Sequence, residues 1–332
     1  MGSTPFHRLA LVIPPLFLTI YLLASFPRPP TLPIIHTSLA HLPSSSPSCN
    51  VYPEDLWWPV RYWLIGPEDG RRVVLIHGLS IPAIVWKDVH LYSPHEDTVY
   101  FSMVYLYGRG YSDAPQVTYD TILHTTQLAL LMQHVKWDNA FIIGLSMGGG
   151  IATAFSAHFP HLVNGKVALI ASAGIIESSD ISRTAKFMST PLVQTVSALP
   201  PFQHYMRLLA NTSKSSELYE INPIQEIVRL QTAHLPHYNA AVASSLRDGP
   251  IRGLHFAFQS LAHSGNQVLL IHGTSDKTVP YKYASKIHNL VPQADLVTIN
   301  DGGHDLTVTH ASEVNALLLH FLADEYPYKP RE

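Results

Sequence analysis

The stretch that most constrains the fold of this chain is residues 144–148, Gly-Leu-Ser-Met-Gly, which directly follow the apolar run 140–143. A short apolar run predicts a buried strand, and small residues around the serine allow a sharp turn into a helix. Residues 149–159 are mostly small and apolar, and Pro160 ends the predicted helix. Such a turn exposes the Ser146 hydroxyl, which is typical of a nucleophile elbow. The alternative is a tight strand–helix connection without chemistry.

A serine nucleophile needs a base that takes its proton and an acid that orients the base. At an elbow of this kind the carboxylate and then the histidine follow the serine along the chain. Asp276 follows the apolar run 267–273, at the strand end where open α/β sheets build their sites. His304 follows the next apolar run, 294–299, and a pair of glycines. We therefore expect Asp276 to be the acid and His304 the base.

Both assignments have structural alternatives. Asp276 could cap the following helix, and His304 is one of 20 histidines in the chain. Asp301 and Asp305 flank the predicted base and are weaker candidates for the acid.

Acyl transfer also requires two hydrogen-bond donors for the tetrahedral oxyanion. The elbow predicts the backbone N–H of Met147 as the first. The second is expected from the loop after the apolar run 73–76, where Gly78 lets the chain approach the site and leaves the N–H of Leu79 as a donor. The alternative for this segment is a simple turn that ends a strand.

Five motifs occur in a fixed order along the chain: His77-Gly78-Leu79, residues 106–113 (Leu-Tyr-Gly-Arg-Gly-Tyr-Ser-Asp), residues 144–149, residues 273–276 and Gly302-Gly303-His304. This order resembles the α/β-hydrolase superfamily over about residues 71–323. The resemblance is greatest to the lid-bearing branch of esterases, monoacylglycerol lipases, carbon–carbon bond hydrolases, epoxide hydrolases and cofactor-free haloperoxidases. It implies an α/β fold: a mostly parallel, doubly wound sheet with an inserted helical lid.

Two positions depart from the pattern that the resemblance implies. Epoxide hydrolases and haloalkane dehalogenases carry an aspartate at the elbow, so Ser146 disfavours both activities. Many relatives carry an aspartate where this chain has Tyr105, which leaves open how the turn before Gly-Arg-Gly is held.

The predicted α/β-hydrolase core comprises residues 57–174 and 262–332, and the predicted helical lid is residues 175–261. The lid is inferred because almost a hundred residues separate two strand-like runs, which is too long for a simple crossover. Within it, Phe187, Met188 and Leu192 have near-helical apolar spacing and are candidates for a substrate pocket. The alternative is that they pack the lid on the core.

Residues 1–26 form a separate predicted segment, in which residues 9–26 carry no charge. This length is at the short end for a membrane-spanning helix and long for a signal-peptide core. We expect an uncleaved single-pass N-terminal membrane anchor; the alternative is a cleaved signal peptide and secretion. A Pro/Ser-rich linker, residues 27–56, follows. Residues 60–66 with the turn 67–70 predict a hairpin at the start of the core.

Composition excludes several other classes. A net charge of −3 without basic clusters argues against nucleic-acid binding. The single cysteine, Cys49, excludes an intramolecular disulfide. The histidines form no His-x-x-x-His pair with a helical glutamate, so we expect neither a metal nor a cofactor.

The sequence thus predicts a serine hydrolase that cleaves a lipophilic carboxylic ester through an acyl-enzyme on Ser146. The apolar lid and the predicted anchor favour a lipophilic small-molecule substrate. Two alternatives stay open: a carbon–carbon bond hydrolase or cofactor-free haloperoxidase with the same three residues, and a non-catalytic membrane-tethered binding protein.

Overall fold

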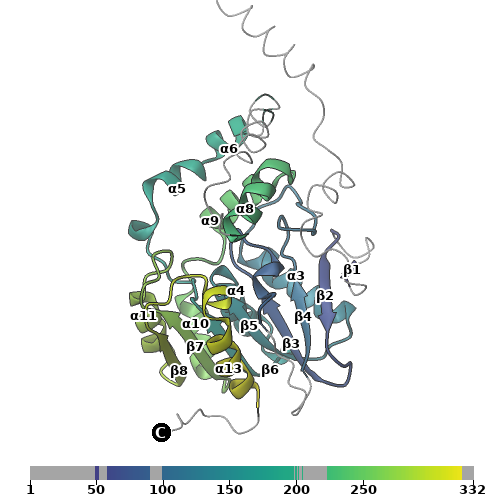
Figure 1. The fold of residues 1–332 in the computed structure, drawn as a ribbon, viewed down its shortest axis with the longest axis vertical. Helices are drawn as coiled ribbons and strands as arrows, with labels where there is room; N and C mark the ends of the chain where they lie inside the picture. The colour runs from purple at the N-terminus through teal and green to yellow at the C-terminus, as the bar shows by residue number, and fades with distance from the viewer. Residues whose placement is uncertain are drawn as a thin grey trace, which may run out of the picture.

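A central sheet organises the chain (Figure 1). The computed structural model describes residues 49–51, 58–89, 99–197, 199, 201, 204 and 223–323. Within these residues the sheet has eight strands in the order β1-β2-β4-β3-β5-β6-β7-β8. Their bounds are β1 Cys49–Val51, β2 Arg61–Ile65, β3 Arg71–Ile76, β4 Val99–Val104, β5 Ala140–Leu145, β6 Val163–Ile170, β7 Gln267–Gly273 and β8 Ala294–Ile299. The six strands β3 to β8 run parallel, as expected for this fold class, and only β1 and β2 are antiparallel.

The predicted hairpin between the first two strands of the core is wrong. The turn forms, closed by a 2.9 Å hydrogen bond from Gly70 N–H to the Pro67 carbonyl. However, β2 pairs antiparallel with β4, and β3 pairs with the other edge of β4. At Gly66, where φ is +110°, the chain passes so close to β4 that a Cβ would lie 2.1 Å from the Val99 carbonyl oxygen. The turn therefore carries the chain past β4, a strand that comes later in the sequence.

Helices cover both faces of the sheet. On one face lie α3 (Thr121–His134), α4 (Met147–His158), α10 (His255–His263) and α11 (Lys282–Leu290). On the other lie the 3-10 helix η1 (Ala83–Trp86), α12 (Leu306–Thr309) and α13 (Ala311–Leu322). Two shorter 3-10 turns, η2 (Pro160–Leu162) and η3 (Ser178–Asp180), flank β6. The two buried apolar clusters are thus separated by the sheet, which is the layer arrangement of a doubly wound fold.

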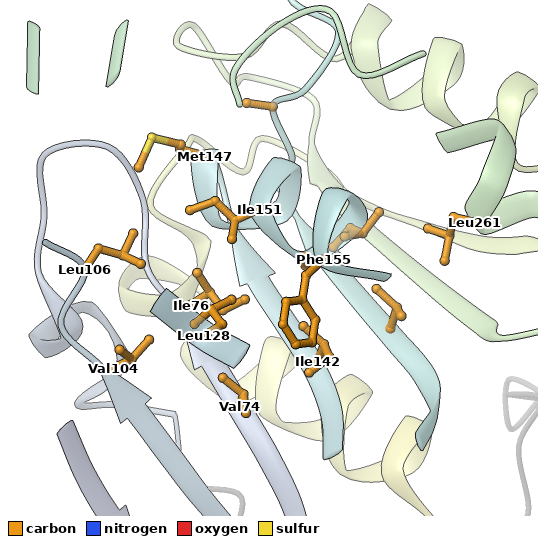
Figure 2. Packing of buried hydrophobic residues seen from close by; sticks show 14 of the residues in the cluster. Val74, Ile76, Val104, Leu106, Leu128, Ile142, Met147, Ile151, Phe155 and Leu261 are labelled. Carbon is orange, nitrogen blue, oxygen red and sulfur yellow. The ribbon is translucent and has the colours of Figure 1, made fainter. Parts of the chain in front are cut away.

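Close packing between the sheet and α4 begins directly behind the elbow. Figure 2 shows Ile76 and Ile142 of the strands against Ile151 and Phe155 of α4 and Leu128 of α3. All five side chains are at most 1% exposed. Burial of side chains this size contributes about 1.5–3 kcal/mol each, so this face holds the elbow in place.

The chain between β6 and β7 forms the insertion. It contains α5 (Arg183–Met188), α6 (Pro191–Ser197), α8 (Pro223–His234) and α9 (Tyr238–Asp248), followed by α10. In Figure 1, α5 and α6 extend furthest from the sheet, whereas α8 and α9 lie above its strand ends. Phe258 and Leu261 of α10 belong to the same buried cluster as α4, so the predicted lid boundary at 261–262 falls inside a helix that packs on the core.

The predicted anchor, residues 1–26, lies outside the described residues, as does most of the predicted linker. Among the residues that are described, no helix combines the length and apolar character needed to cross a membrane.

Candidate active site

Ser146 sits on a strained turn between β5 and α4. Its backbone has φ 57° and ψ −120°, a conformation that costs a non-glycine residue about 1–3 kcal/mol. Hydrogen bonds hold the turn: Ser146 N–H donates to the Ile170 carbonyl at 2.8 Å, and the Ser146 carbonyl accepts from the N–H groups of Gly149 and Ala173 at 2.9 Å. Gly148 is required because a Cβ there would lie 2.1 Å from the Ile76 carbonyl oxygen. The elbow therefore packs directly against the end of β3.

Three side chains from separate strand ends meet at this turn. Ser146 Oγ lies 2.9 Å from His304 Nε2, and His304 Nδ1 lies 2.8 Å from Asp276 Oδ2. The residues follow β5, β8 and β7, whose carboxyl ends share one edge of the sheet. Ser146 is 9% exposed and Asp276 is 5% exposed. The structure thus brings together the serine, histidine and aspartate singled out in the sequence.

Asp276 is held as a carboxylate. Its Oδ1 accepts hydrogen bonds from the N–H groups of Thr278 and Val279, both at 2.8 Å. Burial alone would raise the pKa of Asp276, but the hydrogen bonds and charge of His304, with those two N–H groups, outweigh it and hold this pKa below its usual value. A carboxylate that stays charged can fix the orientation of His304 and stabilise its protonated form.

A second histidine, His272 of β7, contacts the same carboxylate. Sequence reasoning did not predict this contact. Its Nε2 lies 2.8 Å from the Val279 carbonyl oxygen and 3.5 Å from Asp276 Oδ2. Burial lowers the pKa of His272, so the ring stays neutral and donates to the Val279 carbonyl. The pattern Ile-His-Gly at a strand end gave no sign of this contact.

The loop after β3, residues 77–81 (the β3 loop), passes next to Ser146. A Cβ on Gly78 would lie 3.2 Å from Ser146 Cβ and 3.6 Å from Ser146 Oγ. The backbone N–H groups of Leu79 and Met147 have no acceptor within the described part of the chain. Two free donors beside the serine hydroxyl form an arrangement that can stabilise an oxyanion.

His77 fixes the start of the β3 loop. Its Nδ1 donates to the Gly78 carbonyl at 2.9 Å, and its Nε2 accepts from the N–H of Leu106 at 3.0 Å. Burial lowers the pKa of His77 to about 3, so the ring is neutral at neutral pH, as its role as an acceptor requires.

The loop after β4, residues 105–113 (the β4 loop), is held through its backbone. The Tyr105 carbonyl accepts from Ser112 Oγ at 2.6 Å and from Gln127 Nε2 at 3.0 Å, while Gln127 Oε1 accepts from Tyr107 N–H at 3.1 Å. These contacts hold the turn at the position where many relatives carry an aspartate. Gln127 was not predicted, because its only signal is a polar residue on the inner face of α3.

The expected pocket residues are not enclosed. The side chains of Phe187, Met188 and Leu192 are 63%, 47% and 74% exposed on α5 and α6. They face solvent, and their assignment to a substrate pocket stays a prediction. Near-helical spacing identified an apolar helix face but not the direction in which it points.

Among the described residues, no group of three histidine, cysteine or acidic side chains is arranged to hold a metal ion.

The sequence profile of the α/β hydrolase fold family matches residues 72–311. The chain belongs to this family. The profile covers the elbow, the β3 loop and the segments that carry Asp276 and His304.

Three individual proteins that resemble this chain share at most 25% of its residues over the matched region. An uncharacterised protein of Mycobacterium tuberculosis is 25% identical over 71% of this chain and 70% of its own length. The 2-hydroxy-6-oxo-2,4-heptadienoate hydrolase of Pseudomonas putida is 24% identical over 77% of this chain and 90% of its own. Among solved structures, a bacterial membrane phospholipase A is 21% identical with a TM-score of 0.63, covering 96% of each chain. The last match shows the shared fold alone.

Proposed function

We propose that this protein is a serine hydrolase that cleaves a carboxylic ester. The observation that carries the proposal is the continuous hydrogen-bonded chain from Ser146 Oγ through His304 to Asp276. A serine on a strained elbow with both partners in hydrogen-bond range has the geometry that nucleophilic catalysis requires.

In the proposed mechanism, Ser146 Oγ attacks the ester carbonyl while His304 Nε2 takes its proton. The charge that develops on the carbonyl oxygen is stabilised by the N–H groups of Leu79 and Met147. His304 then gives the proton to the leaving alcohol, and an acyl-enzyme forms on Ser146. A water molecule, deprotonated by the same histidine, then attacks the acyl carbon, the bond to Ser146 Oγ breaks, and His304 returns the proton to Oγ as the acid leaves. Asp276 stays ionised throughout and keeps Nδ1 of the histidine protonated.

Carbon–carbon bond hydrolysis is the second candidate, supported by the Pseudomonas putida relative. A dienoate of that kind is a carboxylate, and a buried anion needs a positively charged partner. Arg109, which touches the β3 loop, is fully buried and donates to Leu79, Tyr107 and Ser245, so it is not free to bind one. This observation argues against Arg109 as the partner of such a carboxylate. Incubation with a 2-hydroxy-6-oxo-dienoate and analysis of the products distinguishes the two, and cofactor-free haloperoxidation is recognised by halogenated products.

The proposed ester is lipophilic, and the proposed location is a membrane reached through an uncleaved anchor in residues 1–26. This rests on the uncharged run 9–26 and on the apolar side chains exposed along α5 and α6. We expect activity to rise with acyl chain length beyond acetate, and a flat profile would contradict the lipophilic assignment. Retention of the full chain in membranes after alkaline extraction would support the anchor, whereas an N-terminally shortened mass in the medium would indicate a cleaved signal peptide.

The decisive experiment combines ester turnover with labelling by a fluorophosphonate. The intact chain is expected to hydrolyse p-nitrophenyl esters and to be labelled, whereas Ser146→Ala should lose both while keeping its fold by circular dichroism. A folded Ser146→Ala variant with full activity would overturn the assignment. An intact chain that neither reacts with the probe nor turns over esters would instead support the non-catalytic binding protein.

A further inference from the structure

Two helices of the insertion, α8 and α9 (the inner lid), reach the β3 loop with buried polar side chains. The Ser80 carbonyl accepts a hydrogen bond from Gln231 Nε2 at 3.0 Å and another from the Tyr238 hydroxyl at 2.8 Å. Gln231 is 0% exposed and Tyr238 is 2% exposed. Buried polar groups without partners are strongly disfavoured, so the two helices and this carbonyl fix one another.

The other end of Gln231 contacts the β4 loop. Its Oε1 accepts from the N–H of Gly110 at 2.9 Å. One amide therefore joins the β3 loop to the β4 loop, and it needs both its donor and its acceptor to do so. A glutamate carboxylate has no donor, and leucine has neither a donor nor an acceptor, so neither residue can make both contacts.

Arg109 of the β4 loop also connects the inner lid to the β3 loop, through Leu79, the residue before Ser80. Its Nε donates to the Leu79 carbonyl at 2.9 Å, and its Nη2 donates to Ser245 Oγ of α9 at 2.7 Å. Burial lowers the pKa of Arg109 only to about 10, so the guanidinium stays charged at neutral pH. In the described part of the chain its polar partners are carbonyl and hydroxyl oxygens, and hydrogen bonds from a charged donor are the stronger kind.

We propose that Gln231, Tyr238 and Ser245 are positioning residues that hold the Leu79 N–H toward the reacting carbonyl. The inference rests on the proposed ester hydrolysis. The carbonyls of Leu79 and Ser80 directly follow the donor N–H along the backbone. When both carbonyls are fixed, only the φ and ψ torsions of Leu79 separate the fixed Leu79 carbonyl from the donor N–H. The inner lid is thereby part of the acyl-transfer site and must stay docked during the chemical step, whereas α5 and α6 have no such contact among the described residues.

The test removes single hydrogen bonds and measures turnover, KM and inhibitor affinity in the full chain. Tyr238→Phe deletes only the hydroxyl that reaches Ser80, and we expect kcat to fall about tenfold with KM nearly unchanged. Affinity for a trifluoromethyl ketone, whose adduct with Ser146 carries an oxyanion, should fall by the same factor. Tyr238→Phe combined with Gln231→Leu should lower kcat by about 100-fold, the scale of losing one oxyanion donor.

Tyr283→Phe is the matched control. Tyr283 of α11 is 0% exposed, and its hydroxyl accepts from Glu177 N–H at 2.8 Å and donates to Asp180, both at the start of the insertion. This variant should shift the thermal unfolding midpoint without changing kcat or ketone affinity. Unchanged kcat in Tyr238→Phe, or an equal loss in Tyr283→Phe, would overturn the inference while ester hydrolysis stands. A wild-type chain that neither hydrolyses esters nor reacts with a fluorophosphonate would overturn the proposed function, and this inference with it.

Discussion

Asp276 Oδ2 accepts a hydrogen bond from His304 Nδ1 at 2.8 Å, while the carboxylate receives two backbone N–H groups on its other oxygen. Replacing Asp276 by asparagine removes the charge and presents either an amide donor or a weaker acceptor to the ring. The proton would then no longer be held on Nδ1 of His304, and the protonated ring would lose the nearby negative charge that stabilises it. We expect kcat for ester hydrolysis to fall by about 10³- to 10⁴-fold, measured by p-nitrophenol release.

Asp301→Asn is the control for this substitution. Asp301 is an exposed neighbour of His304 with φ 57°, a backbone conformation that asparagine tolerates. Its variant should keep wild-type turnover. A loss of similar size in Asp301→Asn, or near-normal kcat in Asp276→Asn, would contradict the assignment of Asp276 as the acid.

Acid should destabilise the fold through His77. The pKa of this ring is lowered by burial to about 3 in the folded state, below the value of about 6.5 expected when unfolded. Below pH 6.5 the unfolded chain binds a proton that the folded chain does not, so stability is full above this pH and falls toward pH 3. Between pH 6.5 and pH 5, His77 alone should remove about 2 kcal/mol from the free energy of unfolding.

Urea unfolding of the wild type and of His77→Gln at several pH values measures this contribution. The glutamine carbonyl can still accept from Leu106 N–H but does not titrate. The variant should therefore lose less stability than the wild type over the same pH interval. Parallel pH curves for the two proteins would rule out His77 as the source.

Several of the parallel strands and the three side chains Ser146, Asp276 and His304 could be predicted because each leaves a local mark in the sequence. Gly144 and Gly148, which the turn requires, lie two residues before and after Ser146, and Asp276 and His304 each follow an apolar run whose end lies at one edge of the sheet. The carboxyl ends of parallel strands lie at one edge of the sheet, so side chains that directly follow those strands are expected to lie close together.

The contacts that hold the β3 and β4 loops could not be predicted. Gln127 and Gln231 are single polar residues on helices, and their burial depends on how those helices dock. The exposure of the apolar side chains on α5 and α6 could not be predicted either, since apolar spacing alone does not show which surface covers a helix face. The pairing of β2 with β4 likewise depends on a partner that is distant in sequence.

His124 is expected to lower the free energy of unfolding. It is fully buried on α3, and neither ring nitrogen has a hydrogen-bond partner among the residues that the structure describes. Leucine has a similar volume and leaves no polar atom unsatisfied, so His124→Leu should raise the free energy of unfolding by about 1–3 kcal/mol. Burial, together with the nearby charge of Arg109, holds the pKa of His124 well below its usual value. The stability difference between the variant and the wild type should therefore grow as pH falls from 6.5. In the wild type, His124 binds a proton when the chain is unfolded but not when it is folded, whereas leucine binds none in either state.

The matched control is His255→Leu, since His255 is exposed at the start of α10. Its stability should change by less than about 0.5 kcal/mol, as is usual for surface substitutions. A His124→Leu variant that is less stable than the wild type at pH 7 would contradict this prediction. It would indicate that contacts of the imidazole ring stabilise the fold by more than its two unsatisfied nitrogens destabilise it.

Gly78 and Gly165 are glycines for different reasons, and alanine at each should separate catalysis from stability. At Gly78 the added Cβ would lie 3.2 Å from Ser146 Cβ, close enough to displace the β3 loop by a few tenths of an ångström from the nucleophile. We expect Gly78→Ala to lower kcat by about 10- to 100-fold, since the Leu79 N–H moves with that loop. At Gly165, φ is +73° and nothing lies within 4 Å of the added Cβ, so Gly165→Ala should cost about 1 kcal/mol of stability and leave kcat unchanged. Thermal unfolding and ester turnover of both variants check this, and equal kcat losses would show that Gly78 acts through overall stability rather than through its approach to Ser146.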